Sequence, residues 1–155
     1  MNPDRPFRVT GTNHTSITVS DLTRSIAFYR DCFGFEVTSR APRDPARTSR
    51  LMNVPGADIE IAYVRAPGHS LELIEYRAPA SKSKVEARSC DTGAFHVAFD
   101  VDNLEAALAV CRQHGALPVG DMIEVDAGPN TGRRTCFVRD PDGVLIELIQ
   151  PEPGK

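Results

Sequence analysis

The chain has 155 residues, of which 41% are hydrophobic and 25% are charged, and its formal net charge is −3 at pH 7. This composition is typical of a globular protein rather than a disordered one, and this length predicts a single domain, residues 1–155. The small negative charge argues against nucleic acid as a partner. No apolar run approaches the roughly 20 residues that a membrane helix needs, and the N-terminus has no apolar signal-peptide core. We therefore expect a cytoplasmic protein that binds neither nucleic acid nor a membrane.

Two segments of the chain repeat the same order of residue types. Residues 14–22 and 96–104 both begin with His, alternate as a strand does, and reach an acid or an amide before a Leu. Two matching tetrads follow further along the chain, Leu-Glu-Leu-Ile at 71–74 and Ile-Glu-Leu-Ile at 146–149. Internal repetition of this kind indicates a duplicated structural unit. The sequence therefore predicts two related halves, each with a His strand early and a Glu strand late.

The first half, residues 10–77, is predicted to be a βαβββ module. Alternation of side-chain character over residues 15–19 predicts a half-buried strand. A helix follows, capped by Ser20 or Asp21 and ended by Gly34, because these residue types are preferred at helix ends. The other elements expected in this half are strands at 35–39, 59–64 and 71–76, and a loop at 41–56.

The second half, residues 94–150, is predicted to repeat the βαβββ order. Asp102 and Glu105 form the pattern of a capping box at the start of its helix, and Gly115 ends that helix. The sequence Asp-Pro-Asp-Gly at 140–143 predicts a tight turn between the last two strands. The strands expected in this half lie at 95–101, within 117–125, at 135–139 and at 144–149. The predicted fold class is therefore α+β, with two βαβββ modules.

Two histidines and two glutamates stand at equivalent places in the two halves: His14, Glu72, His96 and Glu147. Strand alternation places each of them on the face away from the helix-packed core, and a curved sheet could gather that face around a cavity. An ionised Glu in the middle of an apolar run is costly unless it is paired or bound to a metal. Imidazole and carboxylate donors suit Zn, Ni, Co, Mn or Fe. We therefore predict that these four side chains hold one divalent metal ion.

The residues around these positions resemble the vicinal oxygen chelate superfamily, which includes glyoxalase I, methylmalonyl-CoA epimerase, fosfomycin and bleomycin resistance proteins, and extradiol dioxygenases. The resemblance spans residues 14–150 and is most specific in Ala-Phe-Tyr at 27–29, in 95–99 and in 137–148. It implies two modules whose curved mixed sheets form a cup around a metal. By position, it implies the glyoxalase I order of ligands, His14, Glu72, His96 and Glu147.

The same resemblance implies a lyase or isomerase of the glyoxalase or epimerase type. In such enzymes a proton leaves the carbon beside a carbonyl of a small oxygenated substrate, and a metal stabilises the enediolate that results. The base must reach the substrate and have a matched pKa. Glu147 and Glu72 are the candidates of the glyoxalase kind, and Glu60 on the neighbouring strand is a further candidate of the epimerase kind.

Four further residues are candidates for substrate binding. Arg50 belongs, with Arg40, Arg43 and Arg47, to an arginine-rich loop before the third strand, which could bind an anionic group on the substrate. Arg134 and its neighbour Arg133 stand at the mouth of the seventh strand and could do the same, and alternation points one of them inward. Thr18 and Tyr76 stand at the two places where glyoxalase I has an Arg and an Asn for glutathione. These differences argue against glutathione as part of the substrate.

Two other functions stay open at this point. An extradiol-type dioxygenase is the alternative among enzymes. A metal-free protein of the bleomycin-resistance kind, which binds a small molecule, is the alternative outside them, and the full set of four ligands argues against it. The resemblance implies modules that pair either within one chain or across a dimer, and we expect a homodimer.

Overall fold

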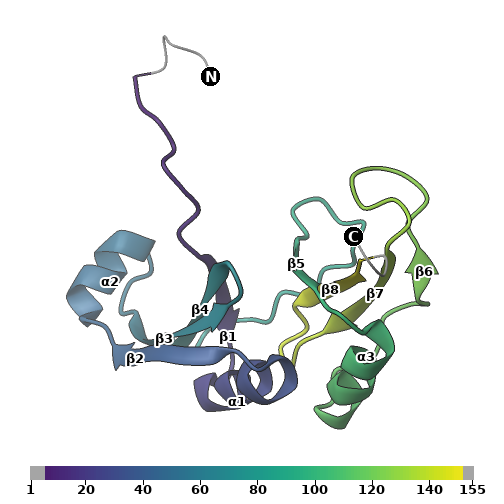
Figure 1. Ribbon diagram of the computed structural model, residues 1–155. Coiled ribbons are helices and arrows are strands. Elements are labelled where there is room, and N and C mark those ends of the chain that lie inside the picture. Colours follow the sequence, from purple (N-terminus) through teal and green to yellow (C-terminus); the bar gives the residue numbers. More distant parts are fainter. Residues whose placement is uncertain (1–5, 152–155) are drawn as a thin grey trace.

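The protein is described by a computed structural model over residues 6–151 (Figure 1). Its first module contains β1 (Thr15–Val19), α1 (Leu22–Phe33), β2 (Glu36–Pro42), α2 (Pro45–Met52), β3 (Asp58–Ala66) and β4 (His69–Ala78). Its second module contains β5 (His96–Asp100), α3 (Leu104–Gln113), β6 (Ile123–Glu124), β7 (Arg134–Arg139) and β8 (Leu145–Gln150). Within the described residues, no helix is long and apolar enough to cross a membrane.

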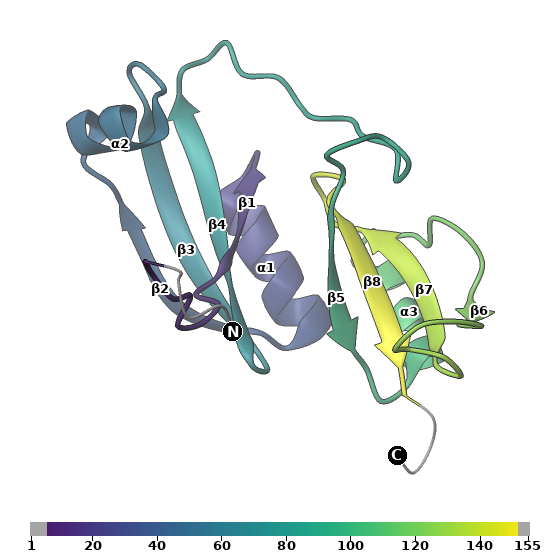
Figure 2. The same cartoon turned by 90° about the horizontal axis from the view of Figure 1, so that it is seen from above.

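Each module forms one four-stranded mixed sheet, in the order β1-β4-β3-β2 in the first and β5-β8-β7-β6 in the second. In both sheets the first strand of the module pairs in parallel with the last strand, and the other neighbours are antiparallel. The two sheets lie side by side with α1 and α3 beneath them (Figures 1 and 2). The predicted α+β fold with two βαβββ modules is thus confirmed.

Two local predictions were wrong, and a third was confirmed only in part. The loop expected at 41–56 contains helix α2. Asp44 caps this helix by accepting a hydrogen bond from the Arg47 N–H, and Pro45 occupies the first turn, where proline is tolerated. Helix α3 is capped by Asn103 rather than Asp102, through a bond from the Ala106 N–H. The strand expected within 117–125 is reduced to the two residues of β6.

One hydrophobic core joins the two modules. It contains the inner faces of both sheets together with the buried faces of α1 and α3. Phe99 of β5 contacts Phe33 and Phe35 of the first module, with ring centroids 5.9 and 5.1 Å apart. Cys32 of α1 lies 3.5 Å from Cys111 of α3, sulfur to sulfur, and all four cysteines are free thiols. Burial on the helix side leaves the opposite sheet faces available for a site.

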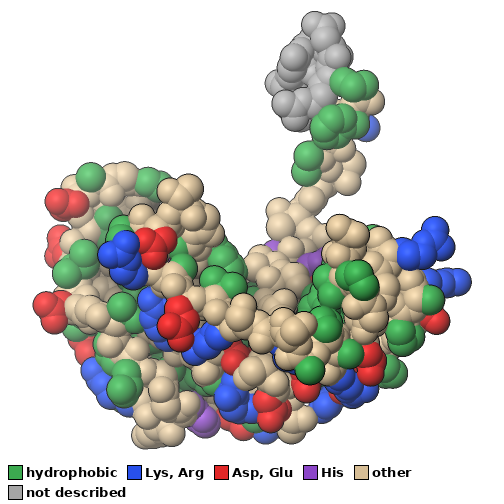
Figure 3. Space-filling model, turned by 180° about the vertical axis from the view of Figure 1, so that it is seen from behind, with side chains coloured by type: hydrophobic (Ala, Val, Ile, Leu, Met, Phe, Trp, Pro, Cys, Tyr) green, Lys and Arg blue, Asp and Glu red, His purple; other side chains and the backbone are tan. Residues whose placement is uncertain are grey.

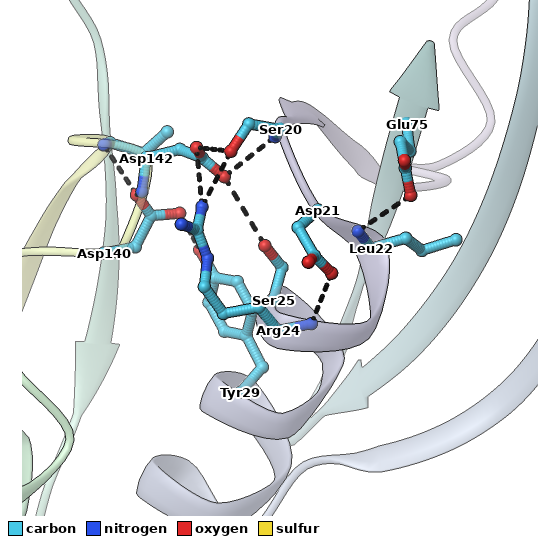
Figure 4. Close-up of polar contacts among 10 residues, drawn as sticks. Ser20, Asp21, Leu22, Arg24, Ser25, Tyr29, Glu75, Asp140 and Asp142 are labelled. Atoms are coloured by element: carbon cyan, nitrogen blue, oxygen red, sulfur yellow. Dashed lines mark hydrogen bonds and ion pairs between the residues drawn. The ribbon is translucent and has the colours of Figure 1, made fainter. Parts of the chain in front are cut away.

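A polar contact also fixes the tight turn of the second module to the start of α1 (Figure 4). The carboxylate of Asp142 accepts from the Ser20 N–H at 3.0 Å, from the Ser20 hydroxyl at 2.6 Å and from Arg24 at 2.8 Å. Burial opposes ionisation of Asp142, but the bonds from Ser20 and the charge of Arg24 outweigh it and lower the pKa. The neighbouring Asp140 accepts from the buried Tyr29 hydroxyl at 3.1 Å. These contacts connect the tight turn of the second module to the first module.

We expect Asp142→Ala to lower the free energy of unfolding by about 1–3 kcal/mol, because three donors lose their charged acceptor. Urea denaturation at pH 7 measures this, with Asp31→Ala as the control, since Asp31 only forms an exposed pair with its neighbour Arg30. The folded-state pKa of Asp142 is lowered, so its contribution is present at neutral pH and lost as the pH falls through that pKa. The difference between wild type and variant should therefore shrink in acid; a constant difference would contradict the assignment.

Candidate metal site

The parallel strand pairs bring each candidate His to its candidate Glu. In the first module Ser16 of β1 pairs with Glu72 of β4, so His14, two residues earlier, shares the face of Glu72. Its Nε2 atom lies 3.4 Å from Oε2 of Glu72. The second module repeats this arrangement: Ala98 pairs with Glu147, and Nε2 of His96 lies 3.3 Å from Oε2 of Glu147. The duplicated sequence therefore produces the same His–Glu pair twice.

The first pair is tightly surrounded. Glu72 is only 8% exposed, and its Oε1 accepts a short hydrogen bond from the hydroxyl of Tyr63, its cross-strand neighbour on β3. The Tyr63 ring lies edge-on to the His14 ring, with centroids 5.6 Å apart. Nδ1 of His14 lies 2.6 Å from the acceptor Oδ1 of Asn13, which places a donor N–H on Nδ1. In the neutral tautomer with this proton, Nε2 carries the lone pair that a metal ligand needs.

The second pair is built on the same plan with different neighbours. Phe137 of β7 is the cross-strand neighbour of Glu147, and its ring lies edge-on to His96 at 5.3 Å. It has no hydroxyl, and Oε1 of Glu147 accepts instead from the hydroxyl of Thr135 at 2.8 Å. The His96 side chain is 45% exposed, so this pair is the more open of the two.

Each pair has the geometry of two adjacent metal ligands. Metal–nitrogen and metal–oxygen distances near 2.0–2.2 Å place two such donors about 2.9–3.4 Å apart for angles between 90° and the tetrahedral value. The observed separations of 3.4 and 3.3 Å agree with this. However, residues 6–151 contain no group of three or more His, Cys, Asp or Glu side chains arranged to hold a metal. The structure thus brings each His to its Glu but does not bring the two pairs together within one chain.

The first pair opens onto an apolar floor. Ile59, Ile61 and Ile74 form a separate buried cluster on this face, against which Tyr63 and Tyr76 pack. Tyr76 lies four residues after Glu72 on the same side of β4, as alternation requires. Thr18 of β1 pairs with Ile74 and is exposed on this face. Figure 3 shows the hollow between the two lobes, in which histidine side chains are visible. Thr18 and Tyr76 therefore lie where a substrate beside Glu72 could contact them.

Glu60 lies on the other face of the sheet. It pairs with Glu75 of β4, whose carboxylate accepts from the Leu22 N–H at the start of α1. Its own carboxylate is bound by Arg40 at 3.1 Å and by Arg77 at 2.5 Å, and the hydrogen bond from Arg40 lowers its pKa. The structure therefore does not bring Glu60 to the His14–Glu72 pair.

The next residues to place are Arg134 and Arg50, the two arginines predicted to bind an anionic group of the substrate. Arg134 faces α3, where its guanidinium bonds to Glu105 and to the sulfur of Met122. Arg133, the preceding residue, falls by alternation on the face of Thr135 and Phe137. Arg50 is exposed on α2. The sequence predicted that one of Arg133 and Arg134 points inward, but only strand register shows which one.

Arg43, one of the arginines of the loop predicted at 41–56, lies beside the first pair. Its N–H donates to the carbonyl of Ile59, a residue of the apolar floor. The hydrogen bond to Glu72 raises the pKa of Tyr63, and the positive charge of Arg43 offsets part of that rise. Among the described residues Arg43 forms no ion pair; its guanidinium reaches only two main-chain carbonyls, at 3.4 and 3.5 Å.

The fold and its side chains define a protein of two βαβββ modules, each with one His–Glu pair on the sheet face away from the helices. The family model described as the Glyoxalase/Bleomycin resistance protein/Dioxygenase superfamily matches residues 11–148. The chain therefore belongs to this superfamily.

Individual relatives agree with this placement. A 2-epi-5-epi-valiolone epimerase from an Actinomyces species is 32% identical over 147 residues, covering 92% of this chain and 80% of the relative. A lactoylglutathione lyase from Salmonella typhimurium is 31% identical over 139 residues, covering 88% and 90%. A glyoxalase family protein from Bacillus cereus has the same fold, with a TM-score of 0.83 at 23% identity, covering 94% and 96%. The named relatives support enzyme activity of the lyase or isomerase kind.

We expect Glu72→Gln to raise the free energy of unfolding of the metal-free protein by about 0.5–2 kcal/mol. The reason is that burying an ionised carboxylate beside apolar side chains lowers stability, and glutamine removes the charge. Glutamine keeps an acceptor for Tyr63 but carries no charge. Urea denaturation with a chelator at pH 8, above the ordinary histidine range, measures the effect. Glu36→Gln, at an exposed pair with Arg65, is the control and should change little. A less stable Glu72→Gln protein would contradict the assignment.

Proposed function

We propose that this protein is a metal-dependent lyase or isomerase that removes a proton from the carbon beside a carbonyl of a small oxygenated substrate. The observation that carries the proposal is the His–Glu pair repeated at the same strand positions in both modules, with separations of 3.4 and 3.3 Å. The relatives named as an epimerase and as lactoylglutathione lyases support this class of reaction.

The ligand set proposed for the metal is the two pairs together, His14, Glu72, His96 and Glu147. Imidazole nitrogen and carboxylate oxygen suit Zn, Ni, Co, Mn or Fe rather than an ion that prefers sulfur. The contact with Asn13 Oδ1 favours the tautomer of His14 with its proton on Nδ1, in which Nε2 is available to a metal. A divalent ion bound there would supply a Lewis acid that stabilises the negative charge of an enediolate.

The four ligands meet if two copies of the chain associate. We propose a homodimer in which the first module of one copy faces the second module of the other. Strand β1 directly follows His14 and strand β5 begins with His96, and both are edge strands of their sheets within residues 6–151. Phe95, next to His96, is 52% exposed. An apolar side chain at a free strand edge beside half of a ligand set fits a surface that a second copy covers.

The chain's own residues then have separate roles. One of the two glutamates takes the proton from the substrate carbon at its carboxylate oxygen. The apolar floor of Ile59, Ile61 and Ile74 excludes water, which strengthens the electrostatic interactions there. Tyr76 and Thr18 contact the substrate. Arg43, with no acidic partner in the described part of the chain, would bind an anionic group if the substrate carries one.

Metal content tests the proposal directly. After saturation with Ni²⁺ or Co²⁺ and desalting, elemental analysis should find close to one ion per chain, because four correctly placed ligands hold a metal tightly. Alanine at any of the four positions should reduce this content, whereas His114→Ala, at the end of α3, should not. Less than ~0.2 ion per chain would favour the metal-free binding protein.

Mixing variants tests the shared site. A His14→Ala/Glu72→Ala chain and a His96→Ala/Glu147→Ala chain should each bind little metal alone. After unfolding and refolding together, each mixed dimer should regain one intact site, because the intact modules of the two chains then face one another. Elemental analysis of the separated mixed dimer measures this. No recovery would place each site within a single chain.

Solvent exchange tests the reaction. In deuterated water, a hydroxyketone of the cyclitol type should gain deuterium at the carbon beside the carbonyl, as NMR would show, whereas the hemithioacetal of glutathione and methylglyoxal should exchange little, because Thr18 and Tyr76 replace the residues that glyoxalase I uses for glutathione. Glu147→Gln should slow this exchange by about 10²–10⁴-fold, because it removes a candidate base. Oxygen uptake with Fe(II) and catechols, without exchange, would favour the dioxygenase instead.

A further inference from the structure

The position opposite each candidate glutamate differs between the modules by one hydroxyl. Tyr63 and Phe137 are the cross-strand neighbours of Glu72 and Glu147. Both rings lie edge-on to the histidine of their own pair, with interplanar angles of 86° and 88°. Phe137 therefore shows that a ring without a hydroxyl is enough to pack against the histidine, and the hydroxyl of Tyr63 needs another explanation.

The Tyr63 hydroxyl has one acceptor, Oε1 of Glu72. The equivalent oxygen of Glu147 depends on Thr135, whose hydroxyl lies 2.8 Å from Glu147 and 3.1 Å from the Leu148 carbonyl. A hydroxyl has a single proton to donate, so Glu147 shares its donor with the backbone and Glu72 does not. A phenol is also the stronger donor because it is the more acidic group. Glu72 is therefore held more firmly at one oxygen than Glu147 is.

We propose that Tyr63 is a positioning residue that fixes Glu72 as a permanent metal ligand and so leaves Glu147 as the carboxylate free to move and take the substrate proton. The inference rests on the function proposed above. With Oε1 bound by Tyr63, only Oε2 of Glu72 is directed towards Nε2 of His14. A hydrogen bond to a ligand typically contributes 10- to 100-fold to metal affinity, so losing it should be measurable without any substrate.

The test compares Co²⁺ affinity, by competition with a chelator, in full-length dimeric protein. Tyr63→Phe should weaken Co²⁺ binding by about 10- to 100-fold in the wild-type and Glu147→Ala backgrounds, but cause no further loss in Glu72→Ala, because the hydroxyl acts through Glu72. A change of less than about twofold, or an equal loss in the Glu72→Ala background, would overturn the role of Tyr63. Circular dichroism of the metal-free variants separates a change in affinity from a loss of folding.

Phe137→Tyr is the matched variant, because the ring is already present and only a hydroxyl is added. It should give Glu147 a donor of its own, so Co²⁺ should bind at least as tightly while deuterium exchange into the substrate slows by about tenfold or more. Unchanged or faster exchange would overturn the assignment of Glu147 as the mobile carboxylate. Wild-type protein that binds no Co²⁺ would overturn the proposed function and this role together, whereas normal wild-type binding with an inert Tyr63→Phe would overturn this role alone.

Discussion

The parallel pairing of the first and last strand in each module is the constraint on which the rest of the site depends. Register places Ser16 opposite Glu72 and Ala98 opposite Glu147, and it is this register that sets each histidine beside a carboxylate. A slip by one residue would turn Glu72 towards the buried face under α1. The apolar residues on either side of Glu72, Leu71 and Leu73, prevent such a slip, because both are fully buried in the core.

The free-energy cost of burying the Glu72 carboxylate points to a functional reason for this residue. A buried carboxylate beside Ile61 and Ile74 lowers stability unless something compensates it. The hydrogen bond from Tyr63 satisfies one oxygen, and the other lies 3.4 Å from Nε2 of His14. Sequences tolerate such conflicts with local rules chiefly where function requires them. The second module repeats the conflict at Glu147, which makes a chance origin in packing a poor explanation.

Strand alternation and the internal repeat were enough to predict the modules and the four candidate ligands, because both signals are local and periodic. Features that depend on pairing between distant strands were not predictable in this way. Register alone places Glu60 on the α1 face and Arg133, rather than Arg134, on the face of Phe137. Helix α2 was not predicted for a different reason: proline and glycine within 41–56 indicate a loop, but Pro45 stands in the first turn of a helix that Asp44 caps.

A duplicated backbone gives equivalent positions equal geometry, so a difference in function between the modules has to come from side chains at matched places. Tyr63 against Phe137 and Ile61 against Thr135 are such differences, and both change the donor available to a candidate glutamate. A reaction in which one glutamate remains a metal ligand and the other leaves the metal to take a proton requires that the two glutamates have different hydrogen-bond donors. In the homodimer proposed above, each His–Glu pair would supply half of the ligand set, and the module with the Tyr63 hydroxyl would face the module without it. The separation of the two pairs within one chain and the different donors to their glutamates would then serve the same site.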